Sequence, residues 1–390
     1  MPDEDLHADA SAPPIPFKPK ATKGRGAVGN LQGRHEVLIR EAIDDGWSQA
    51  QPGPDDDTVP PVKTLVMPET AKSILTHNSS PDVPFNISLN PYRGCEHGCI
   101  YCFARPTHSY LGLSPGLDFE TRIFAKTNAP ELLRQELAAS SYVPEPIALG
   151  VNTDAYQPCE RELTLTRRVL EVLHECNHPV ALITKSSLIE RDMDLLAPMA
   201  ATRLAIAAVT ITTLDPAIAR TLEPRAAAPA RRLRTIRTLT EAGIPVAVSI
   251  APVIPFVTEP DLERVLDAAA EAGAIGASYI VLRLPWEVNP LFQQWLEAHF
   301  PERAQRVMNR LRDMRGGKEY EAAFGRRMKG EGVWADLIRQ RFDKASARLG
   351  FGARARGFAE MDLSLFRRPL VVPSRRGARP EASGTQLDLF

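Results

Sequence analysis

The chain has 390 residues and a formal net charge of −1 at pH 7, which allows about two domains of roughly 100–200 residues each and indicates no particular partner. Its five cysteines, three of them clustered, argue against a disulfide framework and for a reducing compartment. The start lacks a basic region followed by an apolar run, and no apolar segment approaches the roughly 20 residues of a membrane helix. We therefore expect a cytoplasmic protein with no membrane partner.

The N-terminal segment, residues 1–62, is rich in Pro, Gly, Asp and Ala and has few aromatic residues. Such a composition does not offset the entropy of ordering, so the segment is predicted to be mostly disordered. Its glycine-rich residues 24–30 resemble a phosphate loop only weakly, because no strand precedes them and no Gly-Lys-Ser/Thr follows. Residues 63–84 are expected to lead into the domain that spans residues 63–290.

Residues 85–285 alternate β-branched runs with helical patterns, which is typical of βα units around a parallel sheet. The expected strands are 85–89, 147–152, 180–184, 204–212, 246–251 and 279–284. The expected helices are 129–140, 164–176, 193–199, 230–242 and 260–272. In barrels of parallel strands the functional site lies at the carboxyl ends of the strands, so the residues after each strand are the first candidates.

The last part of the chain has a helical pattern and a basic composition. We expect a basic helical extension over residues 291–357, with helices near 291–296, 307–314 and 333–349, and a flexible tail over 358–390. Residues 302–380 contain 20 Lys and Arg against 9 Asp and Glu. This excess favours a positive face that meets phosphates, although a solvated helix exterior has the same composition.

Three cysteines, Cys95, Cys99 and Cys102, stand within eight residues at the spacing Cys-x3-Cys-x2-Cys. A structural zinc ion usually takes four ligands, commonly from two separated pairs, and this chain has no second pair. Thiolates also hold iron–sulfur clusters, and three of them leave one iron of a cubane cluster without a protein ligand. The spacing therefore favours a [4Fe-4S] cluster with one iron open for chemistry.

This spacing, with Tyr101 before the last cysteine, resembles the signature of the radical S-adenosylmethionine (SAM) superfamily, and residues 90–106 resemble its spore photoproduct lyase branch, often labelled DNA repair photolyases. The resemblance implies an α/β fold, a partial (βα)6 barrel with a helical C-terminal extension. It also implies a [4Fe-4S] cluster on the three cysteines, with SAM on the open iron and Tyr101 near the adenine. One electron would cleave SAM to methionine and a 5'-deoxyadenosyl radical, which abstracts a substrate hydrogen atom.

After the second expected strand, Thr153 and Asp154 match a Ser-Asp pair that contacts SAM in the lyase branch, so the resemblance gives them that role; a helix cap is the alternative. The lyase also has a hydrogen-donor cysteine just before this pair, where this chain has Asn152. This departure weakens the transfer of the lyase reaction. Cys159 lies on the same loop as a candidate hydrogen donor or a small apolar filler, whereas Cys176 falls on the buried stripe of a helix.

The third and fourth expected strands carry two further candidates for SAM binding. Lys185 ends an apolar run, and the resemblance assigns it to the carboxylate of SAM; a surface lysine is the alternative. Thr210 aligns with a SAM-contacting serine of the family, or is a structural strand residue. Glu223 and Arg225, on a loop predicted to lie over the barrel mouth, would hold substrate, SAM or each other.

The chain ends in Gln386, Leu387, Asp388, Leu389 and Phe390. This pentapeptide resembles the motif by which bacterial repair and replication proteins bind the DNA sliding clamp. An accessible terminus suits such a contact, and tethering raises the effective concentration near DNA. Packing of this apolar end on its own domain is the alternative.

The sequence thus predicts a radical SAM enzyme that acts on nucleic acid, through repair of a DNA lesion or modification of a base, with an electron donor such as flavodoxin or ferredoxin. A base within a duplex would have to be flipped out to reach a radical at the barrel mouth. Two other hypotheses stay open. The same chemistry would modify RNA, protein or a metabolite, or the chain is a non-catalytic iron–sulfur adaptor tethered to the clamp.

Overall fold

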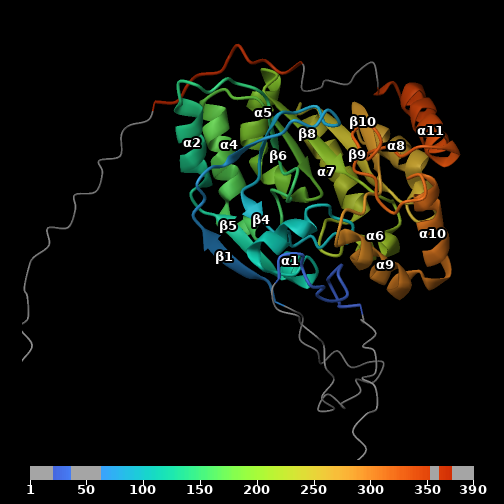
Figure 1. Cartoon of the computed structure of the whole chain (residues 1–390). Coiled ribbons are helices and arrows are strands. Elements are labelled where there is room, and N and C mark those ends of the chain that lie inside the picture. Colours follow the sequence, from blue (N-terminus) through green and yellow to red (C-terminus); the bar gives the residue numbers. More distant parts are fainter. Residues whose placement is uncertain (1–20, 37–62, 352–359, 371–390) are drawn as a thin grey trace, which may run out of the picture.

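A computed structural model describes residues 21–36, 63–351 and 360–370 of the chain (Figure 1). Its larger sheet has seven strands in the order β10-β9-β8-β7-β6-β3-β2, and neighbouring strands are parallel except for β2 and β3. The bounds are β2 Leu75–His77, β3 Ile87–Leu89, β6 Ile147–Leu149, β7 Val180–Thr184, β8 Ala205–Thr210, β9 Val246–Val253 and β10 Gly276–Val281. The six parallel strands confirm the predicted α/β fold.

Helices follow most of these strands, as expected for βα units. The α-helices are α1 Leu117–Thr121, α2 Ala129–Ala138, α3 Glu160–Leu163, α4 Leu165–Glu175, α5 Met193–Ala201, α6 Pro216–Leu222, α7 Pro229–Glu241, α8 Leu262–Glu271, α9 Val288–His299, α10 Pro301–Asp313 and α11 Val333–Leu349. Short 3-10 helices are η1 Arg105–Leu111, η2 Ser187–Asp192 and η3 Glu259–Asp261. In Figure 1, α2, α4 and α5 lie side by side on one flank, and α9, α10 and α11 lie on the opposite flank.

A second, three-stranded sheet was not predicted from the sequence. It has the order β1-β5-β4, with β1 Leu65–Glu69, β4 Tyr92–Arg93 and β5 Arg122–Lys126. Strand β1 contains Pro68 and has no fully buried residue, so it lacks the apolar pattern by which a strand is recognised. The β4 strand of this sheet leads directly into the cysteine loop.

Residues 21–36 also pack against the cysteine loop, which the prediction of a mostly disordered segment 1–62 did not anticipate. Ala27 and Val28 are buried. A Cβ atom on Gly26 would stand 1.9 Å from the carbonyl oxygen of Gly98, so only glycine allows this approach of the two backbones. The carboxylate of Glu120 accepts hydrogen bonds from the amides of Gly26 and Ala27 at 3.0 and 2.8 Å.

Two apolar clusters organise the interior. The larger one lies between the seven-stranded sheet and helices that include α2, α4, α5, α7 and α8. The second joins Ile100 and Tyr101 of the cysteine loop to α9 and α10, including the fully buried Trp295. The indole of Trp295 also donates to the carbonyl of Thr221 at 3.0 Å. The first two helices of the extension therefore support the cysteine loop directly.

Most arginines of the described C-terminal region are neutralised by carboxylates. Ion pairs join Arg303–Glu302, Arg310–Asp313, Arg312–Glu319, Arg326–Glu331, Arg327–Asp82, Arg339–Asp336, Arg341–Glu259 and Arg348–Asp267. In the described part of this region, the basic residues therefore do not form a continuous surface of free cations.

Candidate functional site

A cavity of about 270 Å³ lies where the parallel strands end. The residues that line it come from the cysteine loop and from the ends of β6 to β10. Residues 83, 85 and 328 complete the lining. The lining residues include Cys95, His97, Cys99, Tyr101, Cys102, Phe103, Asn152, Asp154, Thr184, Lys185, Thr210, Ser249, Arg283 and Met328. The expectation that strand-end residues form the site agrees with this lining.

The cysteine loop presents all three cluster candidates to this cavity. Cys95 and Cys99 are buried, Cys102 is half-buried, and none is in a disulfide. Tight turns bring them together, because the amide of Gly98 donates to the carbonyl of Cys95 and the amide of Cys102 donates to that of Cys99. Gly98 has φ +67°, in the left-handed region that favours glycine.

The donor set fits a polynuclear iron–sulfur cluster. Among the described residues, no three His, Cys, Asp or Glu side chains stand close enough to hold one metal ion. A [4Fe-4S] cluster instead takes each thiolate on a different iron, which spaces the sulfur atoms more widely. Burial raises the pKa of Cys95, and burial likewise raises the pKa of Cys99 to about 12. Thiolates at these positions therefore need positive charge such as metal ions supply.

A buried ion pair supports the loop from outside the cavity. Arg105 and Glu120 are both fully buried and paired. The guanidinium of Arg105 donates to the carbonyls of Gly98 and Cys99 at 3.1 and 2.9 Å. Because Glu120 also accepts from Gly26 and Ala27, this pair joins the N-terminal segment to the backbone between two cysteines.

Asp154 lines the cavity after β6, as predicted, with its carboxylate fully engaged. It accepts hydrogen bonds from the hydroxyl of Thr184 at 2.7 Å, the amide of Lys185 at 2.8 Å and the amide of Tyr156 at 2.9 Å. Nδ1 of His97 lies 3.3 Å from Oδ2. Burial acts to raise the pKa of Asp154, but His97 and these hydrogen bonds lower it to about 2. The group is a fixed anion beside the cysteines.

Thr153 is placed differently from its neighbour. It does not line the cavity, and its hydroxyl donates to the carbonyl of Tyr92 at 3.0 Å. Its amide faces Oδ1 of Asn90 at 3.3 Å. In this structure Thr153 therefore ties the β6 loop to the approach of the cysteine loop, and its predicted contact with SAM has no support from its position.

Lys185 and Tyr101 lie together on the cavity wall next to Asp154, whose carboxylate accepts from the amide of Lys185. The ammonium of Lys185 is 5.8 Å from the centre of the Tyr101 ring. The Tyr101 hydroxyl donates to the buried Glu223, which also pairs with Arg232. Burial acts to raise the pKa of Glu223, but the charges of Arg232 and Lys185 lower it overall. This chain of contacts fixes the Tyr101 ring against the cavity.

Thr210 lines the cavity at the end of β8 and is buried. Its carbonyl accepts a hydrogen bond from Arg232 at 2.9 Å. Glu223 and Arg225 were predicted to hold substrate, SAM or each other. Instead Glu223 binds Tyr101 and Arg232, and Arg225 pairs with Glu96 at 3.0 Å.

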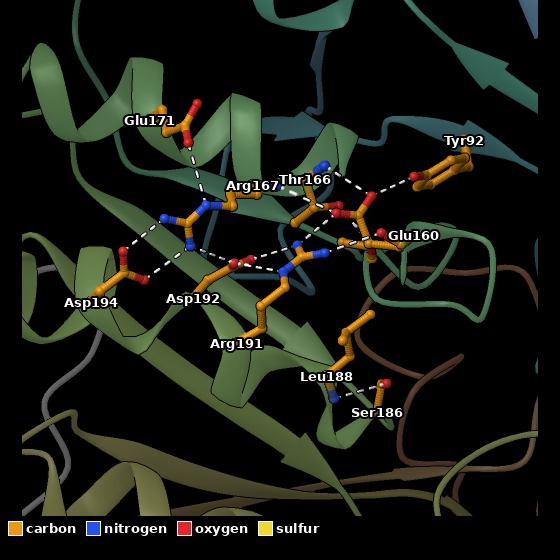
Figure 2. Close-up of polar contacts among 11 residues, drawn as sticks. Tyr92, Glu160, Thr166, Arg167, Glu171, Ser186, Leu188, Arg191, Asp192 and Asp194 are labelled. Atoms are coloured by element: carbon orange, nitrogen blue, oxygen red, sulfur yellow. Dashed lines mark hydrogen bonds and ion pairs between the residues drawn. The ribbon is translucent and has the colours of Figure 1, made fainter. Parts of the chain in front are cut away.

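A charged network ties together the loops that carry Asp154 and Lys185 (Figure 2). Glu160 and Asp192 are fully buried. Arg191 bridges them with contacts of 2.7 and 2.8 Å, and Glu160 also accepts from the hydroxyl of Tyr92. Arg167 pairs with Asp192 at 3.1 Å from the solvent side. The network therefore holds β4, the β6 loop and η2 in one arrangement, although none of these five residues lines the cavity.

Cys159 and Cys176 both pack as apolar residues. Cys159 does not line the cavity; it packs against an apolar cluster that includes Tyr92 and Leu165, and its amide donates to Glu96 at 2.6 Å. The predicted role of Cys159 as a hydrogen donor therefore has no support from its position. Cys176 is buried in the main core, as predicted.

Several cavity residues were missed by the sequence reasoning, among them Phe103, Arg283 and Met328. Phe103 immediately follows Cys102, and its position in the cysteine loop was a usable signal. Arg283 lies two residues beyond β10, but the predicted strand ran to residue 284 and covered it. Met328 comes from a loop far along the chain, so no local pattern indicates it.

Two predictions concern other parts of the chain. The clamp-binding pentapeptide, residues 386–390, lies outside the described residues. No helix in the described part of the chain combines the length and the apolar character needed to cross a membrane.

Comparison with known proteins agrees with this geometry. Residues 89–269 match the family model of the Radical SAM superfamily. An uncharacterized protein of Mycobacterium tuberculosis (strain H37Rv) is 38% identical over 226 residues, which cover 57% of this chain and 66% of the relative. An uncharacterized protein of Methanocaldococcus jannaschii is 26% identical over 57% of this chain and 79% of that protein. The chain thus spans just under two thirds of the length of its mycobacterial relative.

Solved structures share the fold at low sequence identity. A mutant of spore photoproduct lyase superposes with a TM-score of 0.53 at 14% identity, over 73% of this chain and 79% of that chain. The same enzyme complexed with dinucleoside spore photoproduct gives a TM-score of 0.52 at 13% identity, over the same shares. These matches establish a common architecture.

Proposed function

We propose, from the match of residues 89–269 to the Radical SAM superfamily, that the chain is an enzyme that cleaves SAM reductively and directs the resulting radical at nucleic acid. The superfamily implies a [4Fe-4S] cluster and SAM. Cys95, Cys99 and Cys102 would hold the cluster. When bound, it supplies the electron that cleaves SAM to methionine and a 5'-deoxyadenosyl radical.

One observation carries the enzymatic part of this proposal: the three cysteines open onto the same cavity as Asp154 and Lys185. A cation and an anion on separate loops match the two ends of an amino acid, since SAM has a carboxylate and an ammonium group. Lys185 would bind the carboxylate, and its nearby partner Tyr101 would hold the adenosyl part. A non-catalytic iron–sulfur adaptor has no need of this second set of groups.

The nucleic-acid part of the proposal rests on different grounds. The solved lyase that shares this fold was captured with a dinucleoside lesion. The charge count of the C-terminal region adds little, because most of its arginines are paired. The proposed substrate is a DNA lesion, a modified DNA base or an RNA. The proposal also includes an electron donor such as a flavodoxin or ferredoxin.

The test is anaerobic reconstitution of the full chain with iron and sulfide. After reduction, the wild type should convert SAM to 5'-deoxyadenosine, measured by liquid chromatography. Cys99→Ala should lose both the iron and this product, whereas Cys176→Ala, at a cysteine outside the cavity, should keep both. Product formation that survives Cys99→Ala would overturn the assignment of the cluster.

The clamp contact remains a separate proposal based on the sequence of residues 386–390. Deletion of these five residues should abolish co-elution with a sliding clamp and leave SAM cleavage unchanged. Co-elution that is unaffected by the deletion would remove the clamp as a partner of this segment.

A further inference from the structure

Arg283 is a guanidinium at the cavity with weak contacts of its own. Its Nη1 lies 3.5 Å from the sulfur of Met328, and its Nη2 lies 3.4 Å from the hydroxyl of Tyr320. Its Nε is buried without a hydrogen-bond partner among the described residues. A buried donor left unpaired is costly. The Nε atoms of Arg310 and Arg315 are also without a partner among the described residues, so the feature that distinguishes Arg283 is its place on the cavity wall with only weak contacts.

The contrast with nearby arginines makes this arrangement specific. Arg312, Arg327 and Arg341 each have a carboxylate partner, and Arg315 donates to three backbone carbonyls. Within the described part of the chain, no ion pair to Arg283 is found. It is therefore a positive charge on the wall of the cavity with no carboxylate in direct contact, although the charge of Asp82 acts on it from a distance. Such a place favours an anion.

An exposed aromatic ring stands beside it. Phe103 is 47% exposed although it lines the cavity, and the guanidinium carbon of Arg283 lies 5.7 Å from the centre of its ring. Because the ring stays accessible at the cavity, a ligand held there can contact it. An aromatic face next to a guanidinium is suited to a base and its phosphate, because stacking works with any base.

The surroundings of Arg283 are held by a loop, residues 315–332, which we call the strap. The amide of Val281, at the end of β10, donates to the carbonyl of Met328 at 2.8 Å. Arg315 donates to the carbonyls of Leu282, Arg326 and Arg327. The strap therefore holds the two backbone residues just before Arg283, so the side chain starts from a supported strand end.

We propose that Arg283 and Phe103 form a binding site for one unstacked nucleotide, with the phosphate on the guanidinium and the base on the aromatic ring. This inference rests on the proposed function and names the form of its substrate: a single strand, or a nucleotide displaced from a duplex. An intact stacked duplex offers no base face to Phe103. The site lies beside Cys102, so a nucleotide held there is next to the radical source.

The test compares binding of a short fluorescein-labelled single-stranded DNA and the same strand in a duplex to the reconstituted full chain, by anisotropy. Arg283→Gln should weaken single-strand binding about tenfold, as expected for loss of a charge-assisted contact. It should also reduce the salt dependence of the binding constant by the equivalent of about one phosphate contact. Phe103→Leu should weaken single-strand binding by a similar factor. The matched control is Arg306→Gln, at an arginine that stacks on Phe256 outside the cavity, with binding as in the wild type.

Each other result has a defined meaning. A wild type that binds neither DNA would overturn the nucleic-acid function together with this site. A wild type that binds while Arg283→Gln and Phe103→Leu bind equally well would overturn the site alone. SAM affinity is measured in parallel, and a loss of SAM binding in Arg283→Gln as large as its loss of DNA binding would assign Arg283 to the cofactor and overturn the inference.

Discussion

The two sides of the cavity differ in how their polar groups are satisfied. On the side of β6 to β8, Asp154 accepts three hydrogen bonds, and Glu223 is held between Tyr101 and Arg232. On the side of β10, Arg283 has two weak contacts and a buried Nε without a partner. The carboxylates of the first side are held by the protein itself, whereas the guanidinium of the second side has only weak contacts.

This difference indicates a division of labour. Groups that are fully bonded inside the protein keep one position, which suits a cofactor that must be oriented in the same way in every turnover. Groups with unused hydrogen-bonding capacity gain most from a ligand, which suits the substrate. Four predictions test this comparison, and they follow in order of expected effect.

Glu223→Gln should have the largest effect. It leaves the buried guanidinium of Arg232 without its counter-charge, and removal of one partner from a buried pair costs about 3 kcal/mol. The free energy of unfolding, from urea denaturation, should fall by this amount. Glu302→Gln, in an exposed ion pair, should change it by less than ~0.5 kcal/mol. Equal changes in both variants would contradict the importance of the buried pair.

Asp154→Asn should lower the free energy of unfolding by about 2 kcal/mol, because the new amide cannot accept from both Lys185 and Thr184. Arg283→Gln, across the cavity, should cost less than ~0.5 kcal/mol, since its present contacts are weak. These two free energies of unfolding compare the two sides of the cavity directly. A loss at Arg283 as large as that at Asp154 would remove the distinction between them.

Arg327→Ala should cost about 1 kcal/mol, because it breaks the contacts of the strap with Asp82 and Ser80. It should also speed proteolysis within residues 315–332, followed by mass spectrometry. The adjacent Arg326, in an exposed ion pair with Glu331, provides the control. If the Arg326→Ala and Arg327→Ala variants are cut within residues 315–332 at the same rate, the contact with Asp82 does not hold the strap.

Lys329→Met should have the smallest effect, visible in the pH dependence of stability. Burial lowers the pKa of Lys329 to about 8, below its ordinary value of about 10.4. Between these values the unfolded state binds more protons, so the free energy of unfolding rises with pH there. The methionine variant should flatten this rise by ~0.5 kcal/mol in urea denaturation. If the free energy of unfolding depends on pH in the same way in both proteins, the Lys329 ammonium is exposed to water and not buried.

Much of the fold was predictable because it depends on local patterns. Strand β7 has its predicted bounds, 180–184, since its apolar run is short and sharply ended. The helix α11 also has its predicted bounds, 333–349. By contrast β1 pairs with β5 more than fifty residues away, and residues 21–36 are ordered by contacts with Glu120 and Gly98. Such long-range contacts leave no periodic signal in the segment itself.

The candidate site, like the fold, was predictable where it depends on local patterns and strand order. Cys95, Asp154 and Lys185 follow strands, so topology alone brings them to one edge of the sheet. Thr153 was predicted to contact SAM together with Asp154, but only Asp154 lines the cavity. The orientation of two adjacent side chains on a loop depends on the hydrogen-bond partner of each, and the Thr153 hydroxyl donates to the carbonyl of Tyr92.

The strap also bears on how this scaffold changes over evolutionary time. The seven-stranded sheet does not close on itself, and between β10 and β2 the gap is spanned by Arg327, bound to Asp82, and by the amide of Gly325, bound to the same carboxylate. No ladder of strand hydrogen bonds fixes the length of residues 315–332. Insertions there can widen or narrow the entrance while the cysteine loop and the strand ends stay unchanged. The proposed radical-generating site is thus separable from the part that would select its target.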